Sequence, residues 1–537
     1  MKIKIPATLP NISNQNPKYT HKIYITDDTR ELDKDTLLIR TKGNEGFIDK
    51  LLADSCGSSF DDSLVASKSP LKNLQDFIIT PKDLATMFAP LPSLVAITGT
   101  NGKTTTAAII YSILLDLGYT CGLLGTRGAY KNDKKIRPKG LTTPSLLELY
   151  EILLECRDCD FVIMEVSSHA IVQERVAGLE FASKVLTNIT SDHLDYHKTL
   201  EEYIRVKNHF LLDESSLSSG GSIIINADEK NAWLNDLQDS RAMSANTKNA
   251  VLYYAIEQGR LPKVNLKADA YSLDNGISAH ISLKYDDKVS DKKAKETLEQ
   301  TLINAHLYGK HNLYNILAAI LCVKSLKKPI NSKDFVASHS AASHCTDSHC
   351  ATPLWQIHLE SISAALQNFG GVEGRMEVVS HSPLIIVDFA HTHDGMEQIF
   401  ESFRGREIAV VFGAGGDRDR SKRPKMGLCA YKYAKKLYIT SDNPRSENPQ
   451  RIIEDILGGI PKECHRRVVC QSDRAEAIAQ AIGELESQEV LLILGKGDET
   501  YQILGDRSID FDDREVVREI LSKQNPSQKQ SQNTPQK

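Results

Sequence analysis

The most regular feature of the chain is an alternation of short apolar runs with stretches of helical periodicity, which begins near residue 93. The runs SLVAIT, DFVIMEV and SKVLTNIT are examples. Short apolar runs separated by helical patterns are typical of a parallel sheet with crossover helices. The pattern therefore predicts an α/β domain built on a parallel sheet.

A second series of apolar runs predicts another sheet towards the end of the chain. Its runs PLIIVDFAH, REIAVVFGAGGDRD, KLYITSDNPR and QEVLLILGKGDE each end in a polar or glycine-rich loop. In open α/β sheets ligands bind beyond the carboxyl ends of the strands, which is where these four loops lie. We therefore predict a separate C-terminal α/β domain with a binding site in its loops.

Changes in pattern and composition divide the chain into three predicted domains and a tail. Residues 1–92 form a small unit of mixed pattern, residues 93–371 the central domain and residues 372–523 the C-terminal domain. The central domain includes a Ser/His/Cys-rich stretch at about 336–354, which we interpret as a surface insertion, with a metal site as the alternative. Residues 524–537 are polar and are expected to be a disordered tail.

Composition narrows the class of protein. The chain has 537 residues, 41% of them hydrophobic and 25% charged, and a net charge of -5, which is typical of a globular protein with more than one core. This balance gives no reason to expect a nucleic-acid partner. The sequence shows no signal-like start and no apolar run of about 18 residues. We therefore expect a cytoplasmic monomer without membrane insertion, whose scattered cysteines are reduced.

A glycine-rich loop, GTNGKTT, follows the first strand of the central domain and leads into an apolar helix pattern. In such a loop backbone N–H groups converge on phosphate oxygens, Lys103 can reach the terminal phosphates and Thr104 can bind magnesium. Ile97 stands where the general motif has its first glycine, and a turn without a ligand is the alternative. The predicted ATP contacts of this loop are Gly99, Thr100, Asn101, Gly102, Lys103, Thr104 and Thr105.

The loop is the first of several motifs in which the chain resembles the Mur ligase family. The short form G-T-x-G-K-T is shared by these ligases and folylpolyglutamate synthetases. MEVSSH, DHLDYH, GKHN, GRME and DFAHT follow in the family's order, and the matches run from about Thr29 to Tyr501. The resemblance implies a three-domain α/β fold: a small N-terminal uridine-binding domain, a central P-loop ATPase domain and a Rossmann-like C-terminal domain.

The resemblance assigns catalytic roles to Lys103, Glu165, His193 and Lys207. Glu165 ends a predicted strand and matches a magnesium ligand, together with Thr104 and a carbamylated Lys207. The alternative for Glu165 is a solvated acid at a strand end, and from residue type alone Lys207 would be a surface charge. The further nucleotide contacts that the resemblance implies are Asn312, Arg375, Asp388 and His391.

The resemblance also implies two sets of substrate contacts. The set for a uridine-linked muramoyl substrate is Thr29, Thr142, Thr143, Ser167, Gln173 and Arg175. The set for the incoming amino acid is Arg418, Asp442, Asn443, Pro444, Arg445, Gly495 and Glu499. The motif DNPR is the form of members that add meso-diaminopimelate, whose second carboxylate can form a bidentate pair with the Arg445 guanidinium.

The function that the resemblance implies is that of an ATP- and magnesium-dependent ligase in peptidoglycan synthesis. It would add meso-2,6-diaminopimelate to UDP-N-acetylmuramoyl-L-alanyl-D-glutamate through an acyl phosphate. The alternatives are an L-lysine-adding member, another Mur or folylpolyglutamate-type ligase, and a P-loop nucleotide switch that is no ligase. The DNPR motif argues against the first, the MEVSSH motif and the TTP motif (Thr142, Thr143 and Pro144) against the second, and the four C-terminal loops against the third.

Overall fold

The computed structural model describes most of the central and C-terminal parts of the chain and fragments of the N-terminal part. The described residues are 2–4, 24–31, 36–55, 74–232, 249–257, 264–274, 276–287, 295–327 and 357–524. The stretch predicted as an insertion, about 336–354, and the predicted tail beyond residue 524 lie outside them.

Contacts within the chain divide it into two compact units. The first unit consists of Met1–Ala270, His280–Leu302 and Tyr314–Leu366, and the second of Tyr271–Ala279, Ile303–Leu313 and Gln367–Lys537. The short segment Ile303–Leu313, which carries the GKHN motif, is therefore grouped with the C-terminal part of the chain and not with the sheet that precedes it.

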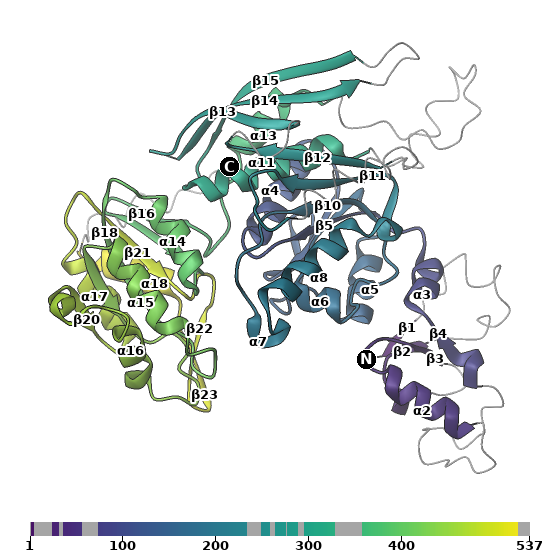
Figure 1. Ribbon diagram of the computed structural model, residues 1–537, viewed down its shortest axis with the longest axis horizontal. Coiled ribbons are helices and arrows are strands. Elements are labelled where there is room, and N and C mark those ends of the chain that lie inside the picture. Colours follow the sequence, from purple (N-terminus) through teal and green to yellow (C-terminus); the bar gives the residue numbers. More distant parts are fainter. Residues whose placement is uncertain are drawn as a thin grey trace. The chain divides into compact units, whose positions relative to one another are not determined.

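The first unit is built on a large sheet with the strand order β15-β14-β13-β12-β11-β10-β5-β9-β6-β7-β8 (Figure 1). Its strands from β12 to β6 in this order are parallel, and β7 and β8 add antiparallel pairs. The strands are β5 (Ser93–Thr98), β6 (Cys121–Gly125), β7 (Gly128–Lys131), β8 (Lys134–Arg137), β9 (Phe161–Glu165), β10 (Phe181–Leu186), β11 (Leu217–Asn226), β12 (Ala250–Ala255), β13 (Leu266–Ser272), β14 (Ile277–Asp287) and β15 (Lys295–Ala305).

Helices cover this sheet because its central strands are apolar on both faces. All five residues of β9 are buried; one face packs against α5, whereas α4 contacts β5, β6 and β9. Strands buried on both faces are typical of parallel sheets in α/β proteins. The helices are α4 (Lys103–Asp116), α5 (Leu146–Glu155), α6 (Ser168–Val172), α7 (Leu194–His197), α8 (Leu200–Leu212), α11 (Lys310–Ser325) and α13 (Leu359–Gln367).

The N-terminal part of the first unit contains a small separate sheet in the order β1-β2-β3-β4. Its elements are β1 (Lys2–Lys4), β2 (Tyr24–Thr26), β3 (Thr36–Ile39), β4 (Ile78–Ile79), α2 (Glu45–Ser55) and α3 (Pro81–Phe88). A capping box fixes the start of α3, since the hydroxyl of Thr80 accepts from the N–H of Asp83 and the Asp83 carboxylate accepts from the N–H of Thr80. The small sheet together with α2 and α3 agrees with the predicted small N-terminal α/β unit.

The second unit has a six-stranded sheet in the order β16-β17-β21-β18-β19-β20, parallel except for the β16–β17 pair. The four predicted apolar runs are its adjacent strands β17, β21, β18 and β19. The strands are β16 (Glu377–His381), β17 (Leu384–Asp388), β18 (Glu407–Phe412), β19 (Lys436–Ile439), β20 (Val468–Cys470) and β21 (Glu489–Leu494), with a hairpin of β22 (Tyr501–Leu504) and β23 (Arg507–Asp510).

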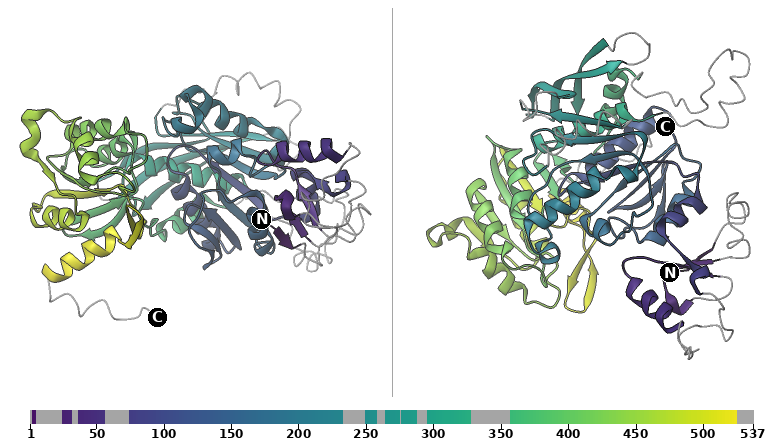
Figure 2. Two further views of the ribbon diagram at one scale, coloured as in Figure 1. Left: turned by 90° about the horizontal axis from the view of Figure 1, so that it is seen from below. Right: turned by 45° about the vertical axis from the view of Figure 1, so that its right-hand side comes forward.

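Alternate residues of these strands belong to two cores, one on each face of the sheet. Ile386 and Val410 pack with α14 (His393–Glu401), α15 (Lys422–Tyr433) and α16 (Pro449–Leu457). Val387 and Val411 pack with α17 (Arg474–Gly483) and α18 (Asp513–Gln524), on the opposite face (Figures 1 and 2). The predicted fold class, parallel-sheet α/β in both large parts of the chain, is thus confirmed.

Among the described residues, no helix is both long enough and apolar enough to cross a membrane.

Candidate active site

The glycine-rich loop connects β5 to α4, as the sequence predicts. Gly99 and Gly102 have φ angles of 145° and 83°, which favour glycine. A Cβ atom on Gly99 would lie 1.9 Å from the Thr187 hydroxyl, and one on Gly102 would lie 2.3 Å from the amide oxygen of Asn315. Neighbouring side chains therefore lie so close to the loop that only glycine fits at these two positions.

Two lysines converge on this loop from different helices. The Lys103 ammonium donates to the carbonyls of Gly99 and Thr100 at 2.9 and 2.8 Å. Lys207, from α8, donates to the same Gly99 carbonyl at 3.0 Å and is buried. Burial, followed by the charge of Lys103, holds the pKa of Lys207 well below its usual value. Lys207 is therefore not the solvated surface charge that its residue type alone allows.

Glu165 lies at the carboxyl end of β9, 2% exposed, in a nest of hydrogen-bond donors. One of its oxygens, Oε2, accepts from the Thr104 hydroxyl at 2.9 Å. The other, Oε1, accepts from the N–H of Thr126 at 2.9 Å, and the Thr126 hydroxyl donates to Oε2 at 3.3 Å. Carboxylate and hydroxyl oxygens are the ligands of hard divalent cations, so the predicted pair Thr104 and Glu165 fits magnesium.

His193 lies on the loop before α7 with a left-handed φ of 54°, and its Nε2 is 3.4 Å from the carboxylate of Asp192. Its ring packs edge-on against His169, with centroids 4.9 Å apart. Burial lowers the pKa of His193 to about 4 against the opposing effect of Asp192. The ring is therefore neutral near pH 7 and offers an unprotonated nitrogen to this loop cluster.

Most residues predicted to hold the muramoyl substrate gather beside Glu165. The Thr143 hydroxyl donates to the Glu165 carbonyl at 2.9 Å and accepts from the N–H of Ser167 at 3.0 Å. The Arg175 guanidinium donates to the Thr143 carbonyl at 2.7 Å and also binds Gln173. The hydroxyls of Thr142 and Thr126 are 3.2 Å apart. The remaining predicted contact, the side chain of Thr29, lies outside the described residues.

The predicted nucleotide contacts of the second unit gather at the carboxyl end of β17. Asp388 accepts from the N–H groups of Met376 and Ala390 at 2.8 and 2.7 Å, and burial raises its pKa. The Arg375 guanidinium stacks on the Phe389 ring, 4.4 Å from its centroid, which is an ordinary cation–π geometry. His391 lies on the same loop, where its Nδ1 is 3.1 Å from the Phe389 carbonyl.

The remaining predicted nucleotide contact is Asn312. Its side-chain amide donates to the carbonyl of Tyr308 at 2.9 Å. Asn315, three residues on, contacts the phosphate loop of the first unit, since its amide oxygen accepts from the Thr106 hydroxyl at 3.3 Å.

The residues predicted to hold the amino acid gather at the carboxyl ends of β19 and β21. The Asn443 amide donates to the Glu499 carboxylate at 2.8 Å, and the buried Lys496 ammonium lies 3.2 Å from the same oxygen. Asp442 lies against Gly495, where an added Cβ would be 2.6 Å from its carboxylate. These contacts place an anionic group beside the DNPR motif.

The two predicted arginines of this site lie beside one glycine. Arg445 has a left-handed φ of 52° and donates to the carbonyl of Gly416 at 2.7 Å. A Cβ on Gly415 would be 3.0 Å from the Arg445 guanidinium and 3.6 Å from the Arg418 side chain. A Cβ on Gly416 would clash with the Pro444 carbonyl at 1.8 Å. The two predicted arginines thus lie on neighbouring loops beside Gly415.

A buried ion pair that the sequence did not predict supports these loops. Arg474 donates to both oxygens of Asp513 at 2.7 Å, and both side chains are fully buried. The same guanidinium donates to the carbonyls of Ser441 and Leu494, the residues that precede the DNPR and GKGDE motifs. Arg474 therefore ties together the carboxyl ends of β19 and β21.

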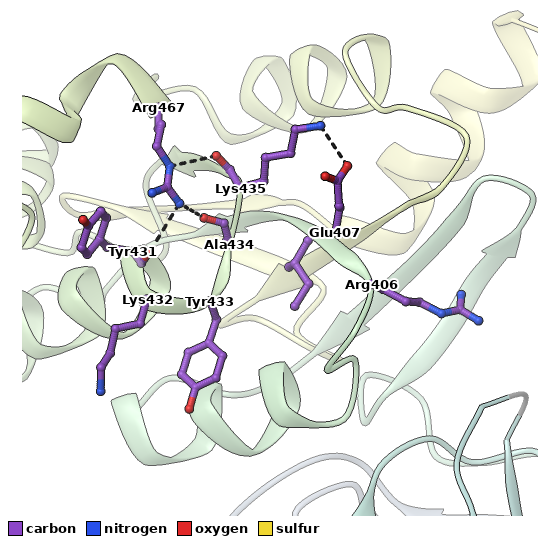
Figure 3. A pocket seen from close by; sticks show the side chains of 9 residues that line it. Arg406, Glu407, Tyr431, Lys432, Tyr433, Ala434, Lys435 and Arg467 are labelled. Carbon is purple, nitrogen blue, oxygen red and sulfur yellow. Dashed lines mark hydrogen bonds and ion pairs between the residues drawn. The ribbon is translucent and has the colours of Figure 1, made fainter.

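The opposite edge of the same sheet carries a pocket of about 410 Å³ with a different character (Figure 3). Two of its cations are engaged by the protein itself. Arg467 donates to the carbonyls of Ala434 and Lys435 just beyond α15, and the Lys435 ammonium is 3.0 Å from Glu407. This pocket lies at the carboxyl end of α15 and is lined by none of the predicted site residues.

Comparisons with known proteins find relatives that match nearly the whole chain. The model of the Mur ligase middle domain matches residues 97–323, and that of the Mur ligase, glutamate ligase domain, matches residues 374–497. A UDP-N-acetylmuramoyl-L-alanyl-D-glutamate--2,6-diaminopimelate ligase of Helicobacter hepaticus is 50% identical over 533 residues, which cover 95% of this chain and 99% of that protein. The ligase of the same name from Wolinella succinogenes is 50% identical over 82% of this chain and 88% of its own length.

Solved structures support the fold. A structure of a UDP-N-acetylmuramoyl-L-alanyl-D-glutamate--2,6-diaminopimelate ligase is 24% identical, covers 98% of this chain and 100% of its own, and superposes with a TM-score of 0.59. A folylpolyglutamate synthase of Mycobacterium tuberculosis, complexed with ADP and AMPPCP, is 14% identical, covers 77% of this chain and 91% of its own, and has a TM-score of 0.54.

Proposed function

Because this chain belongs to the Mur ligase family, we propose that it is an ATP-dependent ligase that adds meso-2,6-diaminopimelate to UDP-N-acetylmuramoyl-L-alanyl-D-glutamate in peptidoglycan synthesis. The observation that carries the proposal is the 50% sequence identity to the Helicobacter hepaticus ligase over 95% of the chain. The DNPR motif and the arginine pair beside Gly415 support diaminopimelate rather than L-lysine. A cytoplasmic location and a monomeric state remain part of the proposal.

The first chemical step is activation of a carboxylate. An oxygen of the D-glutamyl carboxylate attacks the γ-phosphorus of ATP and ADP leaves, which gives an acyl phosphate. Lys103, which donates to carbonyls of its own loop, is placed to transfer those hydrogen bonds to phosphate oxygens when ATP binds. Its charge would then stabilise the charge that develops on the transferred group.

Magnesium fits the oxygens of Thr104 and Glu165, and when bound it would neutralise phosphate charge. His193 is expected to help hold the loop before α7, because its neutral ring lies 3.4 Å from the carboxylate of Asp192.

We propose that Lys207 is carbamylated. Its lowered pKa favours the neutral amine, whose nitrogen adds to the carbon of carbon dioxide and loses a proton. The resulting anion would replace the repulsion between Lys207 and Lys103 by an attraction. It would also supply the third oxygen ligand that the resemblance implies.

In the second step the amine nitrogen of diaminopimelate attacks the acyl carbon. Phosphate leaves with one of the original carboxylate oxygens, the amine loses a proton, and an amide bond remains. The loops of β19 and β21 are suited to bind this amino acid: Arg445 and Arg418 match its carboxylates and Glu499 matches its distal ammonium. Glu499 is held for this role by Asn443 and Lys496.

The test is phosphate release with ATP, Mg²⁺ and UDP-N-acetylmuramoyl-L-alanyl-D-glutamate, compared among meso-diaminopimelate, L-lysine and no amino acid. Release with diaminopimelate alone, with the matching mass gain on the uridine-linked product, is the expected result. Equal release with L-lysine would overturn the specificity. Release that is indifferent to every amino acid would overturn the ligase itself and favour a nucleotide switch.

A further inference from the structure

Two threonines flank β6, and each binds a carboxylate at one end of the neighbouring strand β9. Thr120, before β6, directs its N–H and its hydroxyl to Asp160, both at 2.8 Å. Thr126, after β6, directs its N–H and its hydroxyl to Glu165 at 2.9 and 3.3 Å. The same local arrangement thus occurs twice on one strand pair, but only the copy at the carboxyl end adjoins the site.

The hydroxyl of Thr126 has a second neighbour, because it lies 3.2 Å from the hydroxyl of Thr142. A hydroxyl carries one proton to donate and can accept other hydrogen bonds. Since the carboxylate of Glu165 only accepts, the Thr126 proton is directed to Glu165, and the Thr142 proton is directed to Thr126. The direction of this chain of hydrogen bonds therefore depends on the Glu165 carboxylate.

Glu165 is tied to the neighbouring threonine as well. The Thr143 hydroxyl donates to the Glu165 backbone carbonyl at 2.9 Å, and this threonine is fully buried. The side chain and the main chain of the predicted metal ligand are thus each connected to one threonine of the TTP motif.

We propose that Thr126 is a positioning residue that couples binding of Mg²⁺–nucleotide to binding of the muramoyl substrate. The inference rests on the proposed function, because that assigns Glu165 to the metal and Thr142 to the substrate. Movement of the Glu165 carboxylate towards a cation changes the acceptor that Thr126 faces, and Thr142 reorients with it. Coupling between two ligands is reciprocal, so each ligand strengthens the binding of the other by the same factor.

The direction of the hydrogen bonds also indicates which kind of substrate group can donate a hydrogen bond to Thr142. With its own proton directed to Thr126, the Thr142 oxygen presents lone pairs and no donor to the substrate. A peptide N–H of the muramoyl dipeptide is the matching group, whereas a carboxylate oxygen would meet a second acceptor. The peptide part of the substrate is therefore assigned to the position beside Thr142.

The experiment measures binding of UDP-N-acetylmuramoyl-L-alanyl-D-glutamate by calorimetry, without nucleotide and with Mg²⁺ plus a non-hydrolysable ATP analogue. For the unsubstituted protein, the analogue should tighten binding by about 5-fold or more. In Thr126→Val, which keeps the backbone N–H to Glu165 but loses the hydroxyl, this factor should fall to about 1–2, within the range of weak coupling. Thr126→Ser should restore it.

Thr120→Val is the matched control, because it removes the same kind of hydrogen bond at the other end of the same strands. It should lower the thermal midpoint at least as much as Thr126→Val, because the Thr120 hydroxyl also accepts from the N–H of Asp160, while keeping the full coupling factor. Equal factors in Thr126→Val and Thr120→Val would overturn the proposal, as would an unsubstituted protein whose ligands bind independently. Absence of any binding of the muramoyl dipeptide to the unsubstituted protein would instead refute the proposed substrate, and the inference with it.

Discussion

The carboxyl edges of the two parallel sheets carry their functional residues in different ways. In the first unit the loops are held by glycines, hydroxyls and backbone groups around one carboxylate, Glu165. In the second unit ion pairs of buried arginines hold the loops, above all Arg474 with the fully buried Asp513 and Arg423 with the partly exposed Glu447. The first arrangement suits a phosphate chain, which the backbone can bind, and the second suits an amino acid, whose charged groups require placed charges.

This difference has energetic consequences. A neutral hydrogen bond contributes about 0.5–1.5 kcal/mol to stability, so the first site tolerates the loss of single bonds. Removal of one partner from a buried ion pair costs about 3–5 kcal/mol, because the other charge stays buried without compensation. Substitutions in the first unit are therefore expected to change chemistry more than stability, and those at the ion pairs of the second unit stability more than chemistry.

The largest expected effect is on stability in the second unit. Arg474→Met leaves the Asp513 carboxylate buried and also removes the donor to Ser441 and Leu494, so the free energy of unfolding should fall by about 3–5 kcal/mol. Denaturant unfolding measures it. Arg420→Ala is the control, because the exposed Arg420–Asp455 pair should cost only about 0–1 kcal/mol. A loss for Arg474→Met no greater than that of the control would contradict the contrast between the two edges.

The next effect is on chemistry in the first unit. Lys103→Ala should lower kcat by about 10²–10³-fold, as expected when one preorganised cationic donor is removed, with little change in the unfolding midpoint. Phosphate release and thermal unfolding measure the two quantities. Lys134→Ala, at an exposed lysine of β8, is the matched control and should change neither. A large loss of stability together with activity would show that this loop, like those of the second unit, depends on a charged side chain for its stability.

Arg445→Ala sharpens the comparison by separating the two ligands. Loss of a charge-assisted pair costs about 1.5–3 kcal/mol, so the KM for diaminopimelate should rise by about 10–100-fold while the KM for ATP stays nearly constant. Steady-state kinetics with each substrate varied in turn measure both. Arg451→Ala, at an exposed arginine of α16, should leave both constants unchanged. Equal increases for the two substrates would contradict the assignment of Arg445.

The smallest effect is a difference in the response to acid. In the first unit, burial lowers the pKa of His193 from 6.5 to about 4. In the second unit, the hydrogen bond from Arg423 lowers the pKa of Glu447 from 4.5 to about 2. Both folded forms bind fewer protons than the unfolded chain, so both contributions to stability are lost as the pH falls. The first should be lost between about pH 6.5 and 4, the second between about pH 4.5 and 2.

Hydrogen exchange followed by mass spectrometry on peptides of each unit measures this order. Amides around α7 and β9 should lose protection at higher pH than those around α15 and α16. His193→Gln is the control, because it should lessen the decline above pH 4.5 in the first unit, where burial also lowers the pKa of His169 and His197, and should leave the second unit unchanged. Simultaneous loss of protection in both units at one pH would contradict the account.

Local patterns made the motifs predictable. A strand, a glycine loop and a helix are contiguous in the sequence, and therefore the positions of the glycine loop after β5 and of the loops after β17, β19 and β21 could be predicted. Glu165 and Lys207 required the family resemblance, since a single acid or lysine has no distinctive pattern. The structure then shows both of them buried beside the phosphate loop.

The missed residues depend on contacts between distant parts of the chain. Thr126 meets Glu165 and Thr142 only because β6 and β9 are neighbours in the sheet. Arg474 and Asp513 pair from two helices whose spacing carries no periodic signal. The GTRG stretch after the strand CGLLG was the one available hint for Thr126, and a threonine in such a turn is too common to single out.

The most direct test of the ligase chemistry follows one oxygen atom. With ¹⁸O in the D-glutamyl carboxylate of the muramoyl dipeptide, each turnover with ATP and diaminopimelate should transfer one labelled oxygen to the released phosphate. This result is required if the carboxylate attacks the γ-phosphorus and phosphate later leaves from the acyl carbon. Phosphate without label, with unlabelled water as the source of its new oxygen, would contradict the acyl phosphate and with it the proposed ligase mechanism.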